Sequence, residues 1–242
     1  MAETLDIETL FGAGTHFGYS RTRRHPSASP FLFSTRDHTD IFDLVETTKR
    51  LDAARAFASA LSQKGVQVLF VSGKNESKQL VKAAAERAFA PYSANRWIGG
   101  TLTNFKNIRK RIDRLEKLMA ERESGALDKY TKKERLLLDR EIEELLVRFG
   151  GLVTMRDLPA ALFVVDTKHE DTCVREANQL GIPVIGLASS DCDFSFVQYP
   201  IPGNDTSIRS VKLIVDAIAQ AIVEGKKVQN NDPASGKLKS QS

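Results

Sequence analysis

The sequence predicts an α/β protein in which helices cover both faces of a parallel β-sheet, with a pair of long helices inserted. Three apolar runs, at residues 66–72 (VQVLFVS), 161–166 (ALFVVD) and 183–188 (PVIGLA), are typical of strands buried on both faces. Residues 103–149, in contrast, contain no strand-like run. The chain has 242 residues, 41% hydrophobic and 27% charged, which favours one large domain, or a domain with an appendage, over a disordered or collagen-like chain.

Helical stretches follow the first two of these strands. Residues 66–72 lead through Gly73-Lys74 into an expected helix over residues 76–88. Residues 161–166 lead into an expected helix over residues 169–180, which Gly181 ends before the next strand begins. This alternation of strands and helices predicts parallel pairing.

The C-terminal part of the chain predicts one more strand, a long helix and a tail. A strand near residues 197–201 is followed by Pro-Gly-Asn-Asp and then by a helix over residues 206–224. We expect Asp205 to cap the free N–H groups at the start of this helix. The polar stretch from Gly225 onward has no apolar period, which is typical of a disordered tail.

The inserted region predicts two helices that pack against each other. Apolar residues spaced three and four apart form one narrow stripe in each half of the region. Ser124-Gly125 breaks the first helix, and Thr131 with Glu134 forms a capping-box pattern that starts the second. We therefore expect an antiparallel hairpin that projects about 30 Å, although helices lying flat on the sheet are an alternative. The stripes are Phe105, Ile108, Ile112, Leu115 and Met119, then Leu138, Ile142, Leu145 and Phe149.

These patterns divide the chain into three parts. Residues 1–102 and 150–227 form a sheet domain that is discontinuous in sequence, residues 103–149 form the hairpin, and residues 228–242 form the disordered tail. No run of about 18 apolar residues is present, and acidic residues lie where a signal or transit peptide avoids them. We expect a cytoplasmic protein with no membrane association.

Motifs for catalysis are absent from the sequence. The chain lacks GxxxxGK[ST], GxGxxG, GxSxG and HExxH, so neither a nucleotide-binding enzyme nor a common hydrolase is predicted. Cys173 and Cys192 lack the spacing of a zinc site. His16, in GTHFG, is expected to be packed or hydrogen-bonded because no catalytic partner can be identified.

Four aspartates are candidates for a ligand-binding site. Each lies at or beyond the end of a predicted strand, where ligands of parallel sheets commonly bind. Their oxygens are suitable ligands for a divalent cation. Asp191, Asp193 and Asp205 are the candidate metal ligands, with Asp166 beside them. The same residues are also consistent with a helix cap and a solvated loop.

Positive charge is concentrated near the N-terminus. Residues 9–36 contain four arginines and no acidic residue, which is a local excess of +4 and equals the formal net charge of the whole chain. Pro26 and Pro30 interrupt this segment, so we expect a loop or arm. Its guanidinium groups suit phosphates, although a solubilising surface is equally consistent with the pattern.

A second concentration of positive charge lies at the start of the hairpin. Residues 105–117 contain six basic and two acidic residues, again a local excess of +4. Asn95-Arg96-Trp97 and a Gly-Gly turn precede them, although Trp97 is equally consistent with packing. Arginine, asparagine and backbone N–H groups at such a turn are typical of phosphate and 2′-hydroxyl recognition. Two basic regions on a fold without catalytic motifs therefore predict an RNA-binding protein.

Five motifs occur in order along the chain: GTHFG (14–18), NRWIGGTLTN (95–104), LP before ALFVVD (158–159), EANQLGIPV (176–184) and IPGND (201–205). Together with the hairpin, they make the chain closely resemble the bacterial small-subunit ribosomal protein two family over about residues 5–227. The resemblance implies a flavodoxin-like parallel sheet with an inserted antiparallel coiled-coil hairpin. The sequence departs from the family pattern at Tyr19, Arg24, His25 and Ser72.

The resemblance also implies a non-enzymatic role that needs no cofactor and no homo-oligomer. Members of the family bind small-subunit ribosomal RNA, bridge head and body near the messenger RNA exit, and support docking of the OB-repeat ribosomal protein one, on which translation initiation depends. The expected RNA-binding residues are Arg21, Arg23, Arg24, Arg36, Lys74, Arg96, Trp97, Asn104, Lys106, Asn107, Arg109, Lys110, Arg111 and Arg114.

Two other classes of function remain consistent with the residues themselves. One is an enzyme that holds a metal and a phosphorylated small molecule at the aspartate-lined sheet edge. The other is a protein adaptor that uses the hairpin as a docking rod and binds no RNA.

Overall fold

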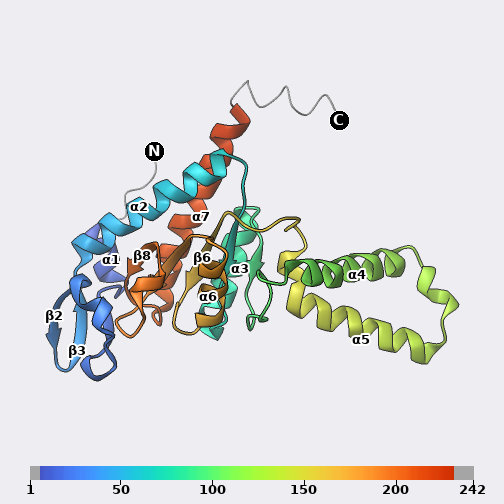
Figure 1. Cartoon of the computed structure of the whole chain (residues 1–242), viewed down its shortest axis with the longest axis horizontal. Coiled ribbons are helices and arrows are strands. Elements are labelled where there is room, and N and C mark those ends of the chain that lie inside the picture. The colour runs from blue at the N-terminus through green and yellow to red at the C-terminus, as the bar shows by residue number, and fades with distance from the viewer. Residues whose placement is uncertain (1–5, 232–242) are drawn as a thin grey trace.

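The computed structural model describes residues 6–231 and contains the predicted parallel sheet (Figure 1). Numbered along the chain within this sheet alone, its five strands lie in the order 2-1-3-4-5, which is the order of flavodoxin-like sheets. The α/β prediction is therefore confirmed. In spatial order the strands are β5 (Tyr92–Ser93), β4 (Val68–Val71), β6 (Ala161–Val165), β7 (Val184–Ala188) and β8 (Tyr199–Pro202).

Alternate residues of the central strands enter two separate cores. Phe70 and Phe163 belong to the core under α2 (Leu44–Gln63), α3 (Asn75–Arg87) and α7 (Ile208–Asn231). Their neighbours Leu69 and Leu162 belong to the core on the opposite face, which contains residues of α6 (Asp171–Gln179) and of the inserted helices. Because successive side chains of a strand point to opposite faces, a continuous apolar run satisfies both layers at once.

The inserted region forms two helices that extend from one end of the sheet domain (Figure 1). Helix α4 (Phe105–Glu123) and helix α5 (Lys132–Phe149) contact each other and are joined by a short 3-10 segment, Ala126–Lys129. Gly125 ends α4 with a φ of 72°, and the predicted capping box at Thr131 and Glu134 is present. The buried stripe residues are Ile108, Ile112, Leu115, Ile142, Leu145 and Phe149, with Leu118 added.

The N-terminal segment is not the loop or arm that the sequence predicted. A short helix, α1 (Ile7–Gly12), precedes an antiparallel sheet in which β3 lies between β1 and β2. Phe31 and Phe42 are buried here against Ala188 and Phe194 of the main domain, and this burial orders the segment. The strands are β1 (Phe17–Ser20), β2 (Leu32–Arg36) and β3 (Thr39–Phe42).

Helix α7 extends beyond its predicted end at residue 224, so residues 225–231 are helical and the predicted tail begins too early. Gly225 lies so close to α2 that a Cβ there would be 2.8 Å from Cβ of Ser62. Lys226 Nζ donates to the carbonyls of Ala88 (2.8 Å) and Phe89 (3.0 Å), which anchors the added turns. Residues 232–242 of the predicted tail lie outside the described part. Within residues 6–231, no helix combines the length and apolar character needed to cross a bilayer.

Replacing Ile112 by Asp should open the contact between α4 and α5, because this fully buried position offers a carboxylate no partner. We expect a loss of about 3 kcal/mol or more and faster proteolysis within residues 103–149, measured on the full chain. Ala120→Asp is the control, because it adds the same charge at an exposed position of α4. Unchanged melting and proteolysis of the Ile112 variant would contradict the observed packing.

Candidate nucleic-acid interface

A single buried carboxylate organises the turn that leads into α4. Glu176, on α6, accepts hydrogen bonds from Trp97 Nε1 (3.1 Å) and from the N–H groups of Gly100 (2.8 Å), Leu102 (3.0 Å) and Thr103 (3.2 Å). The Thr103 hydroxyl donates as well, at 3.2 Å. Burial alone would raise the pKa of Glu176, but these hydrogen bonds outweigh it and lower the pKa below its usual value.

This arrangement settles the role of Trp97, whose side chain is buried and whose indole N–H is used by Glu176. Trp97 is therefore buried as a packing residue, which is the alternative that the sequence left open beside its prediction as an RNA-binding residue. Arg96, next to it, is exposed, as are Asn104 and Asn107. The Asn107 amide donates to Asn104 Oδ1 at 2.9 Å and so links the turn to the first turn of α4.

A groove of about 720 Å³ lies where α4 and α5 meet the sheet domain. We call it the hairpin-root groove. Arg114 pairs with Glu141 across it, through Nε at 3.2 Å and Nη2 at 3.3 Å. Lys110 and Arg111 are exposed, and no ion pair with a described carboxylate engages them; the same holds for Lys106 nearby. Besides Glu141, the polar residues that line the groove are Asn104, Asn107, Lys110, Arg111, Arg114 and Arg148.

Arg109 was predicted to bind RNA, but the structure uses it inside the protein. Its guanidinium donates to Asp113 (2.8 Å) and Glu116 (2.6 Å) on α4. It also donates to the carbonyls of Val153 and Met155, both at 3.2 Å. The side chain is only 14% exposed. Arg109 therefore ties α4 to the segment that follows α5.

The N-terminal arginines fall into two groups, one bound within the protein and one exposed to solvent. Arg24 donates through Nε to Asp40 Oδ2 (2.8 Å), and its Nη2 binds both Asp40 and Thr35. Asp40 is buried, and the hydrogen bond from Arg24 lowers its pKa. Arg24 was predicted as an RNA contact, and the structure places it in an ion pair within the N-terminal sheet. Arg21, Arg23 and Arg36 are exposed, with Arg23 lying 5.0 Å from the centre of the Tyr19 ring.

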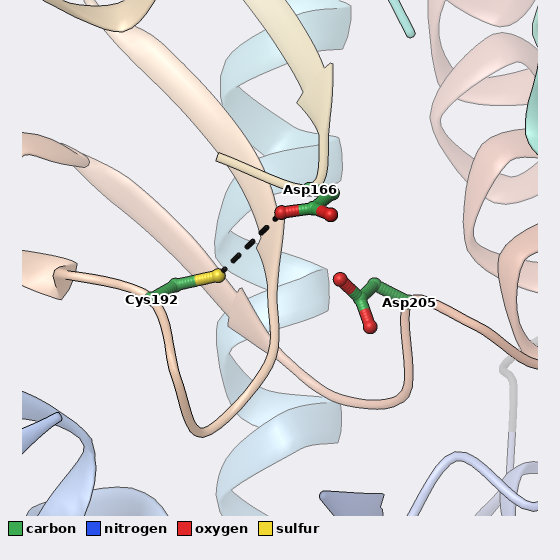
Figure 2. Close-up of side chains that lie close together, drawn as sticks. All are labelled: Asp166, Cys192 and Asp205. Atoms are coloured by element: carbon green, nitrogen blue, oxygen red, sulfur yellow. Dashed lines mark hydrogen bonds between the residues drawn. The ribbon is translucent and has the colours of Figure 1, made fainter. Parts of the chain in front are cut away.

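Lys74 is also used internally, at the sheet edge. Its Nζ lies 2.5 Å from Asp166 Oδ2 and 2.9 Å from Asp205 Oδ2. Figure 2 shows Asp166, Cys192 and Asp205, whose ligand-type atoms lie within 4.8 Å of one another. The ammonium of Lys74, predicted as an RNA contact, thus supplies the positive charge between the two carboxylates.

The predicted metal ligands do not assemble into one site in the described part of the chain. Asp191 pairs with Lys168 Nζ at 2.8 Å, and Asp193 accepts from the Ser195 N–H at 2.9 Å. Only Asp205 of the three joins the cluster of Figure 2. It does not cap α7 as predicted: the Ser207 hydroxyl accepts from the Ser210 N–H at 3.5 Å, and Asn204 Oδ1 accepts from the Thr206 and Ser207 N–H groups just before the helix.

The pKa values of the two clustered aspartates shift in opposite directions. Burial and the nearby negative charge of Asp166 raise the pKa of Asp205 to about 6. Burial acts on Asp166 too, but hydrogen bonds from Lys74 and from the His169 N–H keep its pKa below the usual value. One Oδ atom of Asp205 is buried without a partner. Asp166 therefore holds the negative charge opposite Lys74, and Asp205 takes up the proton first.

Neither Glu176, quoted only as the first residue of the EANQLGIPV motif, nor Arg148 was among the predicted site residues. Glu176 follows Cys173 and Val174 and precedes Ala177, all three buried, so an acidic residue on the apolar side of a helix was the available signal. Arg148 carried no comparable signal, because its place in the groove depends on how α5 meets the sheet domain.

His16 is confirmed as a packed residue. Its ring stacks on Phe11 with centroids 4.4 Å apart and lies 4.0 Å from the ring of Phe17. Phe11 and Phe17 are both about half exposed or more, at 62% and 48%. With Ile7, they leave an apolar surface at α1 and β1.

Replacing Glu176 by Gln should loosen the turn, because one amide oxygen cannot serve five donors. We expect a loss of about 2–4 kcal/mol at neutral pH, measured by urea unfolding. The low folded-state pKa means that the stabilising contribution is present above the unfolded pKa of about 4.3 and is lost as pH falls through the folded value. The difference between wild type and variant should therefore shrink on acidification. Glu143→Gln, at an exposed position of α5, is the control.

The raised pKa of Asp205 predicts the opposite pH dependence, in which the stability of the folded chain falls as pH rises. Its contribution to stability is fully present below the unfolded pKa of about 3.9 and is lost as pH rises through about 6. Asp205→Asn should remove this loss, which is read from urea unfolding between pH 4.5 and 7.5. Asp52→Asn, an exposed carboxylate on α2, should keep the wild-type dependence. Identical curves for wild type and the Asp205 variant would contradict the assignment of the proton.

Comparisons with known proteins agree with this fold. The family described as Ribosomal protein S2 matches residues 10–225. The small ribosomal subunit protein uS2 of Coprothermobacter proteolyticus is 43% identical over 220 residues, covering 91% of this chain and 82% of that protein. Those of Chloroherpeton thalassium (42%; 94% and 91% covered) and Dictyoglomus thermophilum (41%; 93% and 92% covered) are similarly close. The chain therefore belongs to the ribosomal protein S2 family.

Proposed function

We propose that this chain binds small-subunit ribosomal RNA through cationic side chains on the N-terminal sheet and at the root of the hairpin. The proposal refines the role that family membership supplies. The chain is a structural constituent of the small ribosomal subunit in the cytoplasm and not an enzyme.

The observation that carries the proposal is the hairpin-root groove. Lys110 and Arg111 are exposed there without a described carboxylate partner, and two asparagine amides lie beside them. Cations without internal partners are the groups that contribute to binding phosphates, because they release the counterions of the nucleic acid. The amides of Asn104 and Asn107 suit the 2′-hydroxyl groups and base edges of RNA.

The second RNA contact in this proposal is the N-terminal sheet. Arg21, Arg23 and Arg36 are exposed there, and this sheet lies at the end of the molecule opposite to α4 and α5 (Figure 1). Two separate cationic surfaces, one on the N-terminal sheet and one at the hairpin root, can hold two RNA segments at once. We propose on this ground that the chain bridges head and body near the messenger RNA exit.

Docking of the OB-repeat ribosomal protein one completes the proposal. Its support is the apolar surface formed by Ile7, Phe11 and Phe17, because exposed aromatic side chains are enriched at protein interfaces. The stack with buried His16 holds both phenylalanine rings in place. This surface lies apart from the hairpin, so RNA at the hairpin root and a protein partner can bind together.

The two rival functions receive less support. The metal enzyme requires a cationic cofactor between carboxylates, and Lys74 already lies there. The protein-adaptor function gives no reason for exposed cations without carboxylate partners to gather at the hairpin root. A chain that binds a protein partner but no RNA would favour the adaptor over our proposal.

The double substitution Lys110→Ala with Arg111→Ala should weaken incorporation into the small subunit without unfolding the chain. Co-sedimentation with the subunit is followed in lysates at increasing salt, and binding to isolated small-subunit ribosomal RNA gives the salt dependence. Losing two phosphate contacts should reduce the log–log slope by about 1.4 to 1.8. The matched control, Lys64→Ala with Arg209→Ala, removes two exposed charges outside the groove. Equal slopes for the variant and the control would contradict the proposal.

A further inference from the structure

A second groove lies at the hairpin root, between α3 and the end of α5. Its volume is about 490 Å³. The α3–α5 groove, as we call it, is lined by Lys78 and Lys82 from α3 and by Val147 and Arg148 from α5. Asn95, from the segment after β5, also lines it. The sequence motifs drew attention to neither α3 lysine.

The charge of this groove is uniformly positive. Three cations line it, and no carboxylate is among its lining residues. Lys78 has no described ion-pair partner. The nearest carboxylates to the other two cations are weak partners, Glu86 at 3.9 Å from Lys82 and Glu144 at 3.7 Å from Arg148. Exposed ion pairs of this length contribute little, so the positive charge remains available to an anion.

The walls of the groove are held in fixed positions. Asn95 Nδ2 donates to the carbonyl of Val147 at 2.7 Å, which ties the end of α5 to the segment after β5. Gly151 lies against Tyr92 so closely that any Cβ at residue 151 would collide with the Tyr92 carbonyl and ring. A groove that is already formed loses little conformational entropy on binding.

Arg148 connects the two grooves, because it lines both of them. The hairpin-root groove offers Lys110 and Arg111 on the side of α4, and the second groove offers Lys78 and Lys82 on the side of α3. Figure 1 shows α3 beside the root of α4 and α5. The cations of the two grooves thus follow one another around the base of the hairpin.

We propose that the α3–α5 groove is a second phosphate-binding site, in which the RNA backbone continues from the hairpin-root groove past Arg148. Lys78, Lys82 and Arg148 contact successive phosphates, and the Asn95 side chain lies where it can reach sugar or base edges. This inference rests on the proposed RNA-binding function and adds a surface to it.

The test compares double variants of the full chain binding to isolated small-subunit ribosomal RNA at several salt concentrations. Lys78→Ala with Lys82→Ala should weaken binding on the order of tenfold at low salt and reduce the log–log slope by about 1.4 to 1.8. Lys78→Arg with Lys82→Arg should retain binding, because it keeps both charges. Lys64→Ala with Arg209→Ala again controls for loss of two exposed charges, and thermal unfolding establishes that each variant is folded.

The outcomes separate this inference from the proposed function. If the α3 variant binds like the control while Lys110→Ala with Arg111→Ala is weakened, the second site is overturned and the proposed function stands. If neither variant differs from the control, the proposed RNA interface fails together with this extension. Weakening by both variants, with recovery in the arginine variant, supports a backbone path through both grooves.

Discussion

The hairpin and its cationic surface depend on the burial of one carboxylate, Glu176. A buried carboxylate without partners is costly, so its five hydrogen bonds to residues 97–103 leave that turn little freedom. The turn leads directly into α4, and it holds Trp97 in the core while Arg96 stays exposed. The direction in which α4 leaves the sheet domain, and therefore where Lys110 and Arg111 lie, follows from this local network.

At the carboxyl ends of the strands of the main sheet, charged side chains of the protein pair with one another. Flavodoxin-like sheets commonly bind ligands beyond the carboxyl ends of their strands. Here Lys74 follows β4 and pairs with Asp166 after β6 and Asp205 after β8. The N-terminal segment covers the neighbouring end of the sheet, where the Asn204 N–H donates to the carbonyl of Thr15 at 2.9 Å. The paired edge becomes a rigid support between the N-terminal sheet and the inserted helices, in keeping with a structural protein of the ribosome.

Cationic side chains in this protein therefore have two roles: some bind groups of the protein, and others remain exposed. The local sequence does not distinguish the two. Arg24 and Arg109 lie within the same basic segments as Arg23 and Lys110, yet the first two bind carboxylates and carbonyls of the protein. The partners of Arg109 include carbonyls more than forty residues away, as the sequence separations of 44 and 46 show. A count of charges in a segment located these cations but did not separate those bound within the protein from those left exposed.

Local sequence by itself determined the parallel strands, the helices that follow them and the capping box at Thr131, because apolar periodicity and capping report burial and hydrogen bonding over a few residues. The family motifs identified the ribosomal family before any contact was known. Only the tertiary structure decided that residues 17–42 form a sheet, that α7 continues past Gly225, and which cations remain free. Each of these depends on contacts between distant segments, such as Phe42 against Phe194 or Lys74 with Asp205. Such contacts produce no periodic pattern in the sequence, since they form only when the whole chain has folded.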